Sequence, residues 1–461
     1  MTFNIHEPGT IFALLMAFYV CLHCALTIVE ISRTEKAASR VPTPFAKTVS
    51  LAAHRKAVDY NAEIMQCDLV NALVGAAIAV IFTFAGALNG LLSAIEDIWE
   101  QGVFTQFLLV VTVSAILVLV DLPLCWWREF RVNERFGYER SEPRNWITST
   151  LVTTLVGWLC EIPILVACII ILGIFSDHWW LAASLICTVW FWWLWISGPA
   201  WRIRSDTRVK RLEDDDLRRI IGNRLFKEGF VGCDILIAPA PKNSIYGDGV
   251  LIGRRGRMQL VLYDFVFERL TENRQIEAIA TLVIGRKKLH LNALRFILSS
   301  LFMLGFWMML AHAFTHPTFY EALGMSADVA LRDGKPLAGL VISLMLIAAP
   351  ILLYPLVFVL HFFSRSMDYL ADGWAVRRVG SRALVSALIH LYRDYRITLE
   401  PNVLYSLANH RRPHITQRIR AARIRDIKLH AKSLKAMGKP SKNGLVIPSS
   451  VMTQWPDNRH G

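Results

Sequence analysis

The chain has 461 residues, of which 54% are hydrophobic, and it carries a formal net charge of +13. A soluble protein of this length would consist of several domains of average composition. Here the apolar residues are concentrated in long runs, and the charged residues lie between the runs. This distribution excludes an ordinary soluble protein and indicates a protein that crosses a membrane several times.

Several apolar runs are long enough to cross about 30 Å of hydrocarbon, which takes roughly 20 helical residues. The first run lacks the basic residues and the small-residue cleavage site of a signal peptide, so we expect it to be a span. Trp pairs lie at the ends of runs, where aromatic rings favour the membrane–water interface. We therefore predict seven transmembrane helices, at residues 11–31, 69–95, 104–127, 147–175, 179–201, 296–314 and 338–363.

The loops between these runs differ in their content of Lys and Arg. Four segments are basic, namely residues 32–68, 128–146, 202–295 and those after 363, whereas 96–103, 176–178 and 315–337 are poor in Lys and Arg. Basic loops remain on the cytoplasmic side of a membrane. The alternation predicts an N-terminus outside and a C-terminus in the cytoplasm, in the inner membrane if the protein is bacterial.

The chain is expected to fold in alternating membrane and cytoplasmic parts. Strand-like runs at 234–238 and 259–263 flank a glycine-rich stretch, so an α+β domain is expected between the fifth and sixth spans. We predict five spans with basic loops in 1–201, a first cytoplasmic part in 202–295, two spans in 296–363, a second cytoplasmic part in 364–432 and a flexible tail in 433–461.

Two acidic residues lie inside predicted spans. Asp121 belongs to the third span and Glu161 to the fourth, and an ionisable group inside a membrane is costly enough to suggest a function. Each residue is close to a proline, Pro123 or Pro163, so local pairing with the backbone is an equally good interpretation. The Arg and Lys residues of 418–439 are expected to face anionic lipid rather than nucleic acid.

Four stretches in one order resemble the integral-membrane zinc metallopeptidases of the type I CAAX prenyl protease kind. They are VPTPFAKTVSLAAHRKAVDYNAE (Val41–Glu63), NERFGYERSEPRNW (Asn133–Trp146), DGVLIGRRGRMQLVLYD (Asp248–Asp264) and SRSMDYLADGWAVRRVGSRALVSALIHLYRDY (Ser364–Tyr395). The resemblance covers nearly the whole chain. It implies a mainly α membrane protein, with seven transmembrane helices enclosing a water-filled chamber and a cytoplasmic α+β metallopeptidase-like domain.

The helix that follows the hairpin in that family carries H-E-x-x-H. Two His residues at i and i+4 bind zinc from one helix face, and the Glu takes a proton from the zinc-bound water. In QIEAIATLVIGRKKLH the frame residues Glu277, Ala278, Gly285 and Lys288 match the family. The functional positions hold Leu282 for the first His, Val283 for the Glu and Arg286 for the second His.

The remaining zinc-site positions of the family also differ. The resemblance places the third ligand, a Glu, at Leu370 and keeps a supporting Asp at Asp372. The oxyanion-stabilising His before a proline corresponds to Arg412. The sequence therefore predicts a protein without zinc, since no other His or Asp (His290, Asp372, His410, His414) has recognisable ligand spacing.

The substitutions suggest a replacement for the metal. We expect Leu282 and Leu370 to fill the former site by apolar contact. Arg286 and Asp372 are expected to form a partly buried ion pair that joins two helices in place of zinc. An edge strand at Asp248, Gly249, Val250, Leu251, Ile252 and Gly253 could still capture an extended peptide, although a plain hairpin is the simpler interpretation.

Three functions follow from these observations. The favoured one is a catalytically inactive pseudopeptidase, without a cofactor, that binds a prenylated or membrane-inserted peptide, a lipid, or an active relative in the bilayer. The second is an active zinc metalloendopeptidase of the CAAX prenyl protease type, which needs ligands that the sequence lacks. The third is a lipid-handling or transport protein that uses Asp121 and Glu161.

Overall fold

The protein is described here by a computed structural model, which covers residues 8–138, 142–174, 178–240, 248–254, 257–314, 316–325, 327–332, 335–392 and 398–436. The chain forms two compact units. The helical unit consists of residues 1–32, 59–194 and 296–359, and the mixed unit consists of 33–58, 195–295 and 360–461. Each unit is assembled from three segments that are distant in the sequence.

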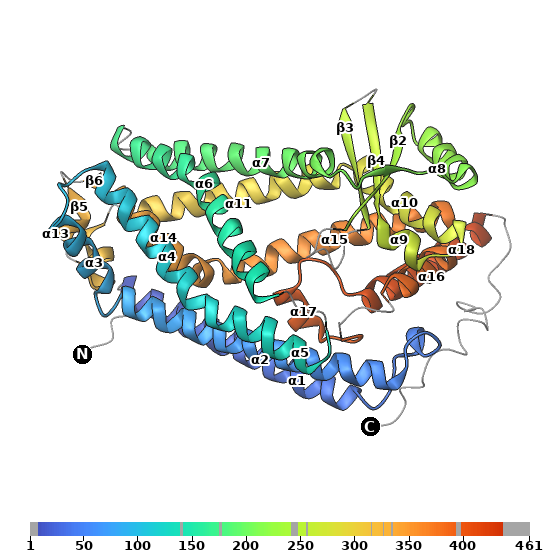
Figure 1. Cartoon of the computed structure of the whole chain (residues 1–461), viewed down its shortest axis with the longest axis horizontal. Coiled ribbons are helices and arrows are strands. Elements are labelled where there is room, and N and C mark those ends of the chain that lie inside the picture. Colours follow the sequence, from blue (N-terminus) through green and yellow to red (C-terminus); the bar gives the residue numbers. More distant parts are fainter. Residues whose placement is uncertain are drawn as a thin grey trace. The chain divides into compact units, whose positions relative to one another are not determined.

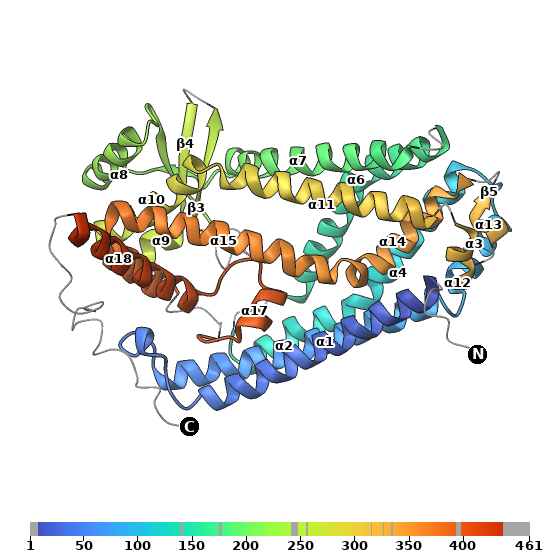
Figure 2. The same ribbon diagram turned by 180° about the vertical axis from the view of Figure 1, so that it is seen from behind.

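The helical unit is built from long apolar helices joined by short elements (Figure 1). Its core includes α4 and α14, where the Gly339 amide donates to Gln106 Oε1 at 3.0 Å. Figure 2 shows α1 and α2 side by side, as Figure 1 does. Elements wholly or mainly in this unit are α1 (Pro8–Ala37), α2 (Leu51–Phe82), α3 (Ala87–Glu96), α4 (Val103–Trp127), the π-helical turn η2 (Arg128–Val132), α5 (Asn133–Arg135), α6 (Pro143–Ile174), α7 (Trp179–Ser205), α11 (Leu291–Phe314), α12 (Pro317–Ala322), α13 (Ala327–Ala330), β5 (Leu331–Arg332), β6 (Lys335–Pro336) and α14 (Ala338–Leu352).

Membrane-spanning helices are confirmed. Five helices of the described part are long and apolar enough to cross a bilayer, and a bent pair adds a sixth: Gly9–Ala37, Leu51–Phe82, Val103–Arg135, Trp179–Gly198, Leu291–Ala313, and Ala338–Leu352 with Tyr354–Val379. The expected fourth span lies in α6, a helix of 32 residues. A total of seven spans stays a prediction.

Two predicted spans differ from the helices that form. The span expected at 69–95 begins earlier, at Leu51, and ends at Phe82; after a short turn Gly86, with a left-handed φ of 73°, precedes the separate helix α3. The span expected at 338–363 is bent by 62° between α14 and α15 (Tyr354–Val379). Pro355 enters α15 at its second residue, and a proline cannot donate to the preceding turn, so the helix breaks there.

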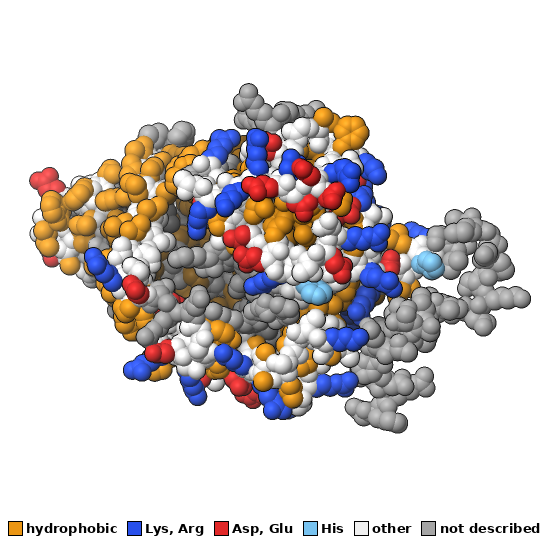
Figure 3. Space-filling view, turned by 45° about the vertical axis from the view of Figure 1, so that its right-hand side comes forward, with side chains coloured by type: hydrophobic (Ala, Val, Ile, Leu, Met, Phe, Trp, Pro, Cys, Tyr) orange, Lys and Arg blue, Asp and Glu red, His pale blue; other side chains and the backbone are white. Residues whose placement is uncertain are grey.

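Large apolar side chains cover the surface of the helical unit. Leu159 on α6 is 70% exposed, Leu185 on α7 is 64% exposed, and Leu14 on α1 is 56% exposed. In Figure 3 hydrophobic side chains form a continuous area with few charges. Such a surface is stable against lipid but not against water.

The mixed unit contains a four-stranded sheet with the order β1-β2-β4-β3. Strands β2 and β4 are parallel, whereas β1 with β2 and β3 with β4 are antiparallel. The strand runs expected at 234–238 and 259–263 are present. The strands are β1 (Lys210–Arg211), β2 (Asp234–Ala238), β3 (Gly249–Arg254) and β4 (Arg257–Tyr263).

Helices surround this sheet and fill the rest of the mixed unit. Asp214 caps the first of them by accepting a hydrogen bond from the Leu217 amide at 2.9 Å. The elements are the 3₁₀ turn η1 (Thr43–Phe45), α8 (Asp215–Lys227), α9 (Asp264–Arg269), α10 (Asn273–Lys288), α15, α16 (Ser381–Leu391), α17 (Val403–Asn409) and α18 (Ile415–Ala436).

Gly285 on α10 is a point of close packing in the mixed unit. A Cβ atom at this position would lie 2.6 Å from the Trp374 ring, which is itself 3% exposed. We expect Gly285→Ala to lower the free energy of unfolding by about 1–3 kcal/mol, because the ring cannot move away without disturbing the core. Thermal unfolding in detergent, followed by Trp fluorescence, measures this effect.

Gly222 provides the matched control for this prediction. It lies inside α8, and a Cβ atom there would meet nothing within 4 Å. Gly222→Ala should raise the free energy of unfolding by about 0.5–1 kcal/mol, because alanine loses less backbone entropy in a helix. Equal effects of the two substitutions would contradict the packing account.

Candidate functional site

The three residues that the resemblance aligns with H-E-x-x-H lie on the buried helix α10. Leu282 is fully buried, Val283 is 2% exposed and Arg286 is 8% exposed. The hairpin β3–β4 and the short helix α9 precede α10 in the chain. The helix therefore stands where the resemblance expects the catalytic helix, and the three aligned positions hold two apolar side chains and one arginine.

The frame residues that match the family have packing partners in the mixed unit. Glu277 accepts hydrogen bonds from Arg224 at 2.8 and 3.2 Å, which joins α10 to α8. Lys288 Nζ donates to the Glu228 carbonyl oxygen at 2.8 Å. Together with Gly285 against Trp374, these contacts give the frame a structural role that does not depend on a metal.

The prediction that Leu282 and Leu370 fill the former metal site by apolar contact is wrong. Leu370 on α15 is 50% exposed, whereas Leu282 has no exposed surface. Asp368 and Asp372 are one helical turn apart and both are buried, at 2% and 1% exposure. Leu370 is two residues from each, so it points to a different side of α15. The carboxylate that faces the arginines is therefore Asp368, two residues before the position expected from the sequence.

The predicted ion pair between Arg286 and Asp372 is also wrong in its partners. Arg286 Nη2 donates at 3.0 Å to Oδ2 of Asp248, the residue immediately before β3. Asp372 instead accepts two hydrogen bonds from Arg418, from Nε at 3.0 Å and from Nη2 at 2.7 Å. The reason is tertiary, because α18 brings Arg418 against α15 and its fork matches the carboxylate in a bidentate pair.

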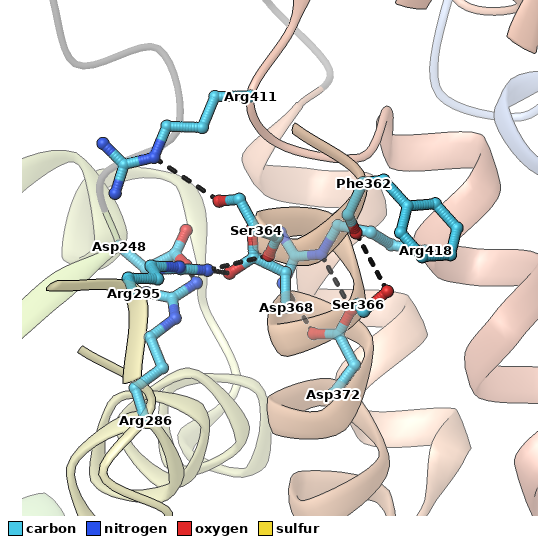
Figure 4. A network of polar contacts seen from close by, with 10 residues as sticks. All are labelled: Asp248, Arg286, Arg295, Phe362, Ser364, Ser366, Asp368, Asp372, Arg411 and Arg418. Atoms are coloured by element: carbon cyan, nitrogen blue, oxygen red, sulfur yellow. Dashed lines mark hydrogen bonds and ion pairs between the residues drawn. The ribbon is translucent and has the colours of Figure 1, made fainter. Parts of the chain in front are cut away.

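A third ion pair lies beside these two. Arg295 Nη2 donates to Asp368 Oδ1 at 2.7 Å and to the Ser364 carbonyl oxygen at 3.1 Å. Arg411 Nε donates to Ser364 Oγ at 3.4 Å. Figure 4 shows Arg286 and Arg295 next to each other near Asp248, with Asp368 and Asp372 on one face of α15.

These groups form what we call the arginine–aspartate cluster. Its members in the described part of the chain are Asp248, Arg286, Arg295, Asp368, Asp372, Arg411, Arg412 and Arg418. Burial lowers the pKa of the Arg412 guanidinium, and the charge of Arg286 lowers it further. Burial and then the charge of Arg295 lower the pKa of Arg411 in the same way. The cations of the cluster therefore repel one another.

The histidines considered as substitute ligands have separate surroundings outside the arginine–aspartate cluster or partners of their own. His290 follows the end of α10, is exposed and has a φ of 50°. His414 is 4% exposed, and its Nδ1 lies 3.0 Å from Thr416 Oγ1. Burial lowers the pKa of His414 to about 3 and that of His410 to about 4. Within the residues that the structure describes, no three His, Cys, Asp or Glu side chains are grouped as metal ligands.

Zinc, which the resemblance implies, does not fit this donor set. The positions that would supply two imidazoles and a base hold leucine, valine and arginine side chains, which have no lone pairs to donate to a metal. Asp368, the carboxylate that faces them, is already bound to Arg295. The site is built to neutralise carboxylates with guanidinium groups rather than to hold a cation.

The predicted peptide-binding edge corresponds to β3, the terminal strand of the sheet. Asp248 is 1% exposed and is held by Arg286, and Leu251 is 6% exposed, so both side chains face the interior. Gly249, Val250 and Ile252 are half-buried, and Gly253 is exposed. Peptide binding at this strand stays a proposal.

The two acidic residues predicted inside spans lie on helices. Asp121 is on α4, and its side chain is exposed. Glu161 belongs to α6, but its side chain lies outside the described residues. These two residues belong to different helices from the arginine–aspartate cluster.

Sequence reasoning missed Asp368, Arg295 and Arg418 as members of the site. One signal was available, because Asp368 and Asp372 are spaced i, i+4 and therefore share a helix face. Their partners could not be found in this way, since Arg295 and Arg418 are 73 and 46 residues away in the chain.

Comparisons with known proteins agree with this architecture. A family model described as the CAAX prenyl protease N-terminal region, with five membrane helices, matches residues 31–201. CAAX prenyl protease 1 of Saccharomyces cerevisiae is 24% identical over 322 residues, which cover 67% of this chain and 70% of the relative. A CAAX prenyl protease 1 homolog of Arabidopsis thaliana is 22% identical over 312 residues, covering 66% and 70%.

A solved structure has a similar fold. The crystal structure of S. mikatae Ste24p matches with a TM-score of 0.74 and 18% identity, over 90% of this chain and 98% of that chain. At this identity the match establishes the fold alone. Taken with the family model and the two relatives, it supports the conclusion that the chain is a CAAX-prenyl-protease-like integral membrane protein with a Ste24p-like fold.

Proposed function

We propose that this protein is a catalytically inactive relative of the CAAX prenyl proteases that binds a membrane-associated peptide, lipid or partner protein. The observation that carries the proposal is Arg286, which occupies the position of the second zinc-binding His and is paired with Asp248. A guanidinium stays charged at all physiological pH values, so it repels a divalent cation.

The other requirements of zinc peptidase chemistry are also missing from α10. A general base must lie within hydrogen-bonding reach of the water that it activates, and Val283 at that position has no titratable group. The carboxylates of Asp248 and Asp368 do not replace this base, because they are ion-pair partners of Arg286 and Arg295. Hydrolysis through a metal-bound water has neither its ligands nor its base.

The binding part of the proposal rests on what the fold retains. Among the described residues β3 is a terminal strand of the sheet, and an extended peptide can add along its outer edge as a further strand. Long apolar helices offer a surface for a prenyl group or a lipid chain. In this proposal the mixed unit is cytoplasmic and the protein has seven spans, as the distribution of Lys and Arg favours.

Metal analysis and a peptidase assay of the purified full chain test the proposed loss of zinc binding and of catalysis. We expect far less than one zinc per chain, and no cleavage of a prenylated CAAX peptide with or without added zinc. CAAX prenyl protease 1 of Saccharomyces cerevisiae, purified in the same detergent, is the positive control. One zinc per chain, removed by a chelator together with peptidase activity, would overturn the proposal in favour of an active metalloendopeptidase.

Mass spectrometry of what co-purifies distinguishes the kinds of binding. A bound peptide or an active relative supports a pseudopeptidase that sequesters substrates or regulates a protease. Recovery of lipid alone, with an effect of Asp121→Asn on lipid transfer between vesicles, would favour the lipid-handling function instead.

A further inference from the structure

A cavity of about 330 Å³ lies in the helical unit, where α4 continues into the π-helical turn η2 and the short helix α5. Small-molecule sites in proteins have volumes of about 300–1,000 Å³, so the cavity is large enough for a ligand. π-helical turns occur frequently at functional sites. All the lining residues belong to the helical unit, namely Glu63, Trp127, Arg131, Val132, Glu134 and Arg135.

Contacts between α2 and the segment after α4 hold the walls of the cavity in place. Tyr60 Oη donates to Asn133 Oδ1 at 3.0 Å, and Arg135 forms an ion pair with Glu63. These contacts join residues that are 73 and 72 positions apart in the chain. Figures 1 and 2 both show α5 beside α2. The cavity is therefore formed by the tertiary structure of the unit and not by one side chain.

One face of α4 and of the turns after it changes from apolar to cationic as it approaches the cavity. Residues spaced by four share a helix face, and this series consists of Leu119, Pro123, Trp127, Arg131 and Arg135. All five side chains are exposed, and the last three line the cavity. The order of apolar side chain, aromatic ring and cation matches a phospholipid from its acyl chain to its phosphate.

This face belongs to a helix that is long and apolar enough to cross a membrane. The span extends from Val103 to Arg135, so the cavity lies at its end. Trp126 and Trp127 form the end of α4, and paired aromatic rings at the end of a span are typical of the membrane–water interface. Lipid headgroups occupy that depth, so the bilayer itself is the source of a ligand for this cavity.

The charged residues of the lining are balanced. Arg131 and Arg135 carry two positive charges, and Glu63 and Glu134 carry two negative charges, so the formal charge is zero. Arg135 is paired with Glu63, whereas Arg131 makes no hydrogen bond or ion pair within the described part of the chain. Such a lining does not favour an excess of negative charge. It fits a zwitterion, because an arginine binds the phosphate and a carboxylate or an aromatic face binds the ammonium.

We propose that this cavity binds a zwitterionic phospholipid with a primary ammonium group. The phosphate accepts from Arg131, the ammonium contacts Glu134 and the Trp127 ring, and an acyl chain lies along Leu119 and Pro123. A carboxylate has two oxygens and accepts several hydrogen bonds, so Glu134 can bind an ammonium in addition to other groups.

The inference goes beyond the proposed function. The cavity belongs to the helical unit, and the residues aligned with H-E-x-x-H belong to the mixed unit. Lipid binding at this cavity therefore applies to an active protease as well as to an inactive relative, and neither result depends on the zinc content of the chain.

Native mass spectrometry of the delipidated full chain in detergent tests the inference, because it counts the lipids that remain bound. The chain is titrated with phosphatidylethanolamine or with phosphatidylglycerol of the same acyl chains, which keeps the phosphodiester but lacks the ammonium. We expect one phosphatidylethanolamine to bind about 10-fold more tightly, since phosphatidylglycerol loses a hydrogen bond between charged groups. Equal affinities, or tighter binding of phosphatidylglycerol, would overturn the inference.

Arg131→Gln removes the cation that holds the phosphate. Arg131 is exposed and makes no ion pair among the described residues, so its replacement carries little risk to folding. We expect about 10-fold weaker binding of phosphatidylethanolamine. The matched control is Arg144→Gln, because Arg144 is an exposed arginine at the beginning of α6 and is not among the lining residues. Equal affinities of the two variants would show that the lipid does not bind in this cavity.

The double variant Glu134→Gln with Trp127→Leu removes both partners of the ammonium. Both side chains are exposed, and thermal unfolding checks that the variant remains folded. We expect the preference for phosphatidylethanolamine over phosphatidylglycerol to fall from about 10-fold to near 1. An unchanged preference in the folded variant would overturn the assignment of the ammonium to this cavity.

Glycerophosphoethanolamine has the same headgroup without acyl chains, so it separates a lipid from a soluble ligand. We expect that it does not displace phosphatidylethanolamine at an equal concentration, because it buries no apolar chain against α4. Displacement at an equal concentration would overturn a phospholipid as the ligand of the cavity.

Discussion

Asp372→Ala is expected to lower the free energy of unfolding of the mixed unit by about 3–5 kcal/mol. The substitution leaves the Arg418 guanidinium without its bidentate partner, at a position where its side chain is 3% exposed. A buried charge that loses its counter-ion cannot recover its hydration, which makes the loss larger than that of a surface ion pair. Denaturant or thermal unfolding in detergent, followed by Trp fluorescence, measures the effect.

Two further variants show whether burial of the ion pair causes this effect. Asp216→Ala removes the partner of Arg219 in an exposed pair, with 76% and 73% exposure, and should cost less than about 1 kcal/mol. Replacing both partners, Asp372→Leu with Arg418→Met, should restore stability close to that of the parent, because no buried charge remains. If Asp372→Ala costs no more than Asp216→Ala, the buried pair does not stabilise the unit.

Stability of the mixed unit is expected to fall steeply as the pH is lowered from 6.5 to about 4. Burial lowers the pKa of His410 to about 4, with a smaller contribution from the charge of Arg365. Burial lowers the pKa of His414 to about 3, with a smaller contribution from His410. In the unfolded chain both titrate near 6.5. Below that pH the unfolded chain binds protons that the folded protein does not, so stability is fully present above 6.5 and is lost below it.

The dependence of stability on pH can be measured and assigned to individual histidines. Each histidine contributes at most about 1.4 kcal/mol per pH unit between its unfolded and folded pKa values. The thermal midpoint of His414→Gln should therefore vary less with pH than that of the parent, whatever its absolute stability. His430→Gln, an exposed histidine on α18, is the control and should leave the slope unchanged. A parent-like slope for His414→Gln would contradict the account.

Local patterns in the sequence were sufficient for several features of the fold. The strand at 234–238 has the expected bounds, because strand patterns depend on neighbouring residues. Apolar runs located the membrane helices, because the length of helix needed to cross a bilayer is a local property. The breaks after Phe82 and Leu352 were missed, since an apolar run does not show where the chain bends.

The ion-pair partners within the site could not be predicted from local sequence patterns. The family resemblance suggested that Arg286 pairs with Asp372, but the protein pairs Arg286 with Asp248 and Asp372 with Arg418. Each of the observed pairs joins two elements whose approach depends on packing of the whole unit. Leu370, the position that the motif aligned with the third ligand, is exposed. The buried side of α15 carries Asp368 and Asp372 instead.

The sequence by itself determined the membrane character of this protein and the two central strands of its sheet, because these depend on composition and on nearby residues. Only the tertiary structure decided that α15 presents Asp368 rather than Leu370, and that five arginines gather around three aspartates. The physical reason is that a buried charge must find its counter-charge in space, and the chain brings those partners together from segments far apart in sequence.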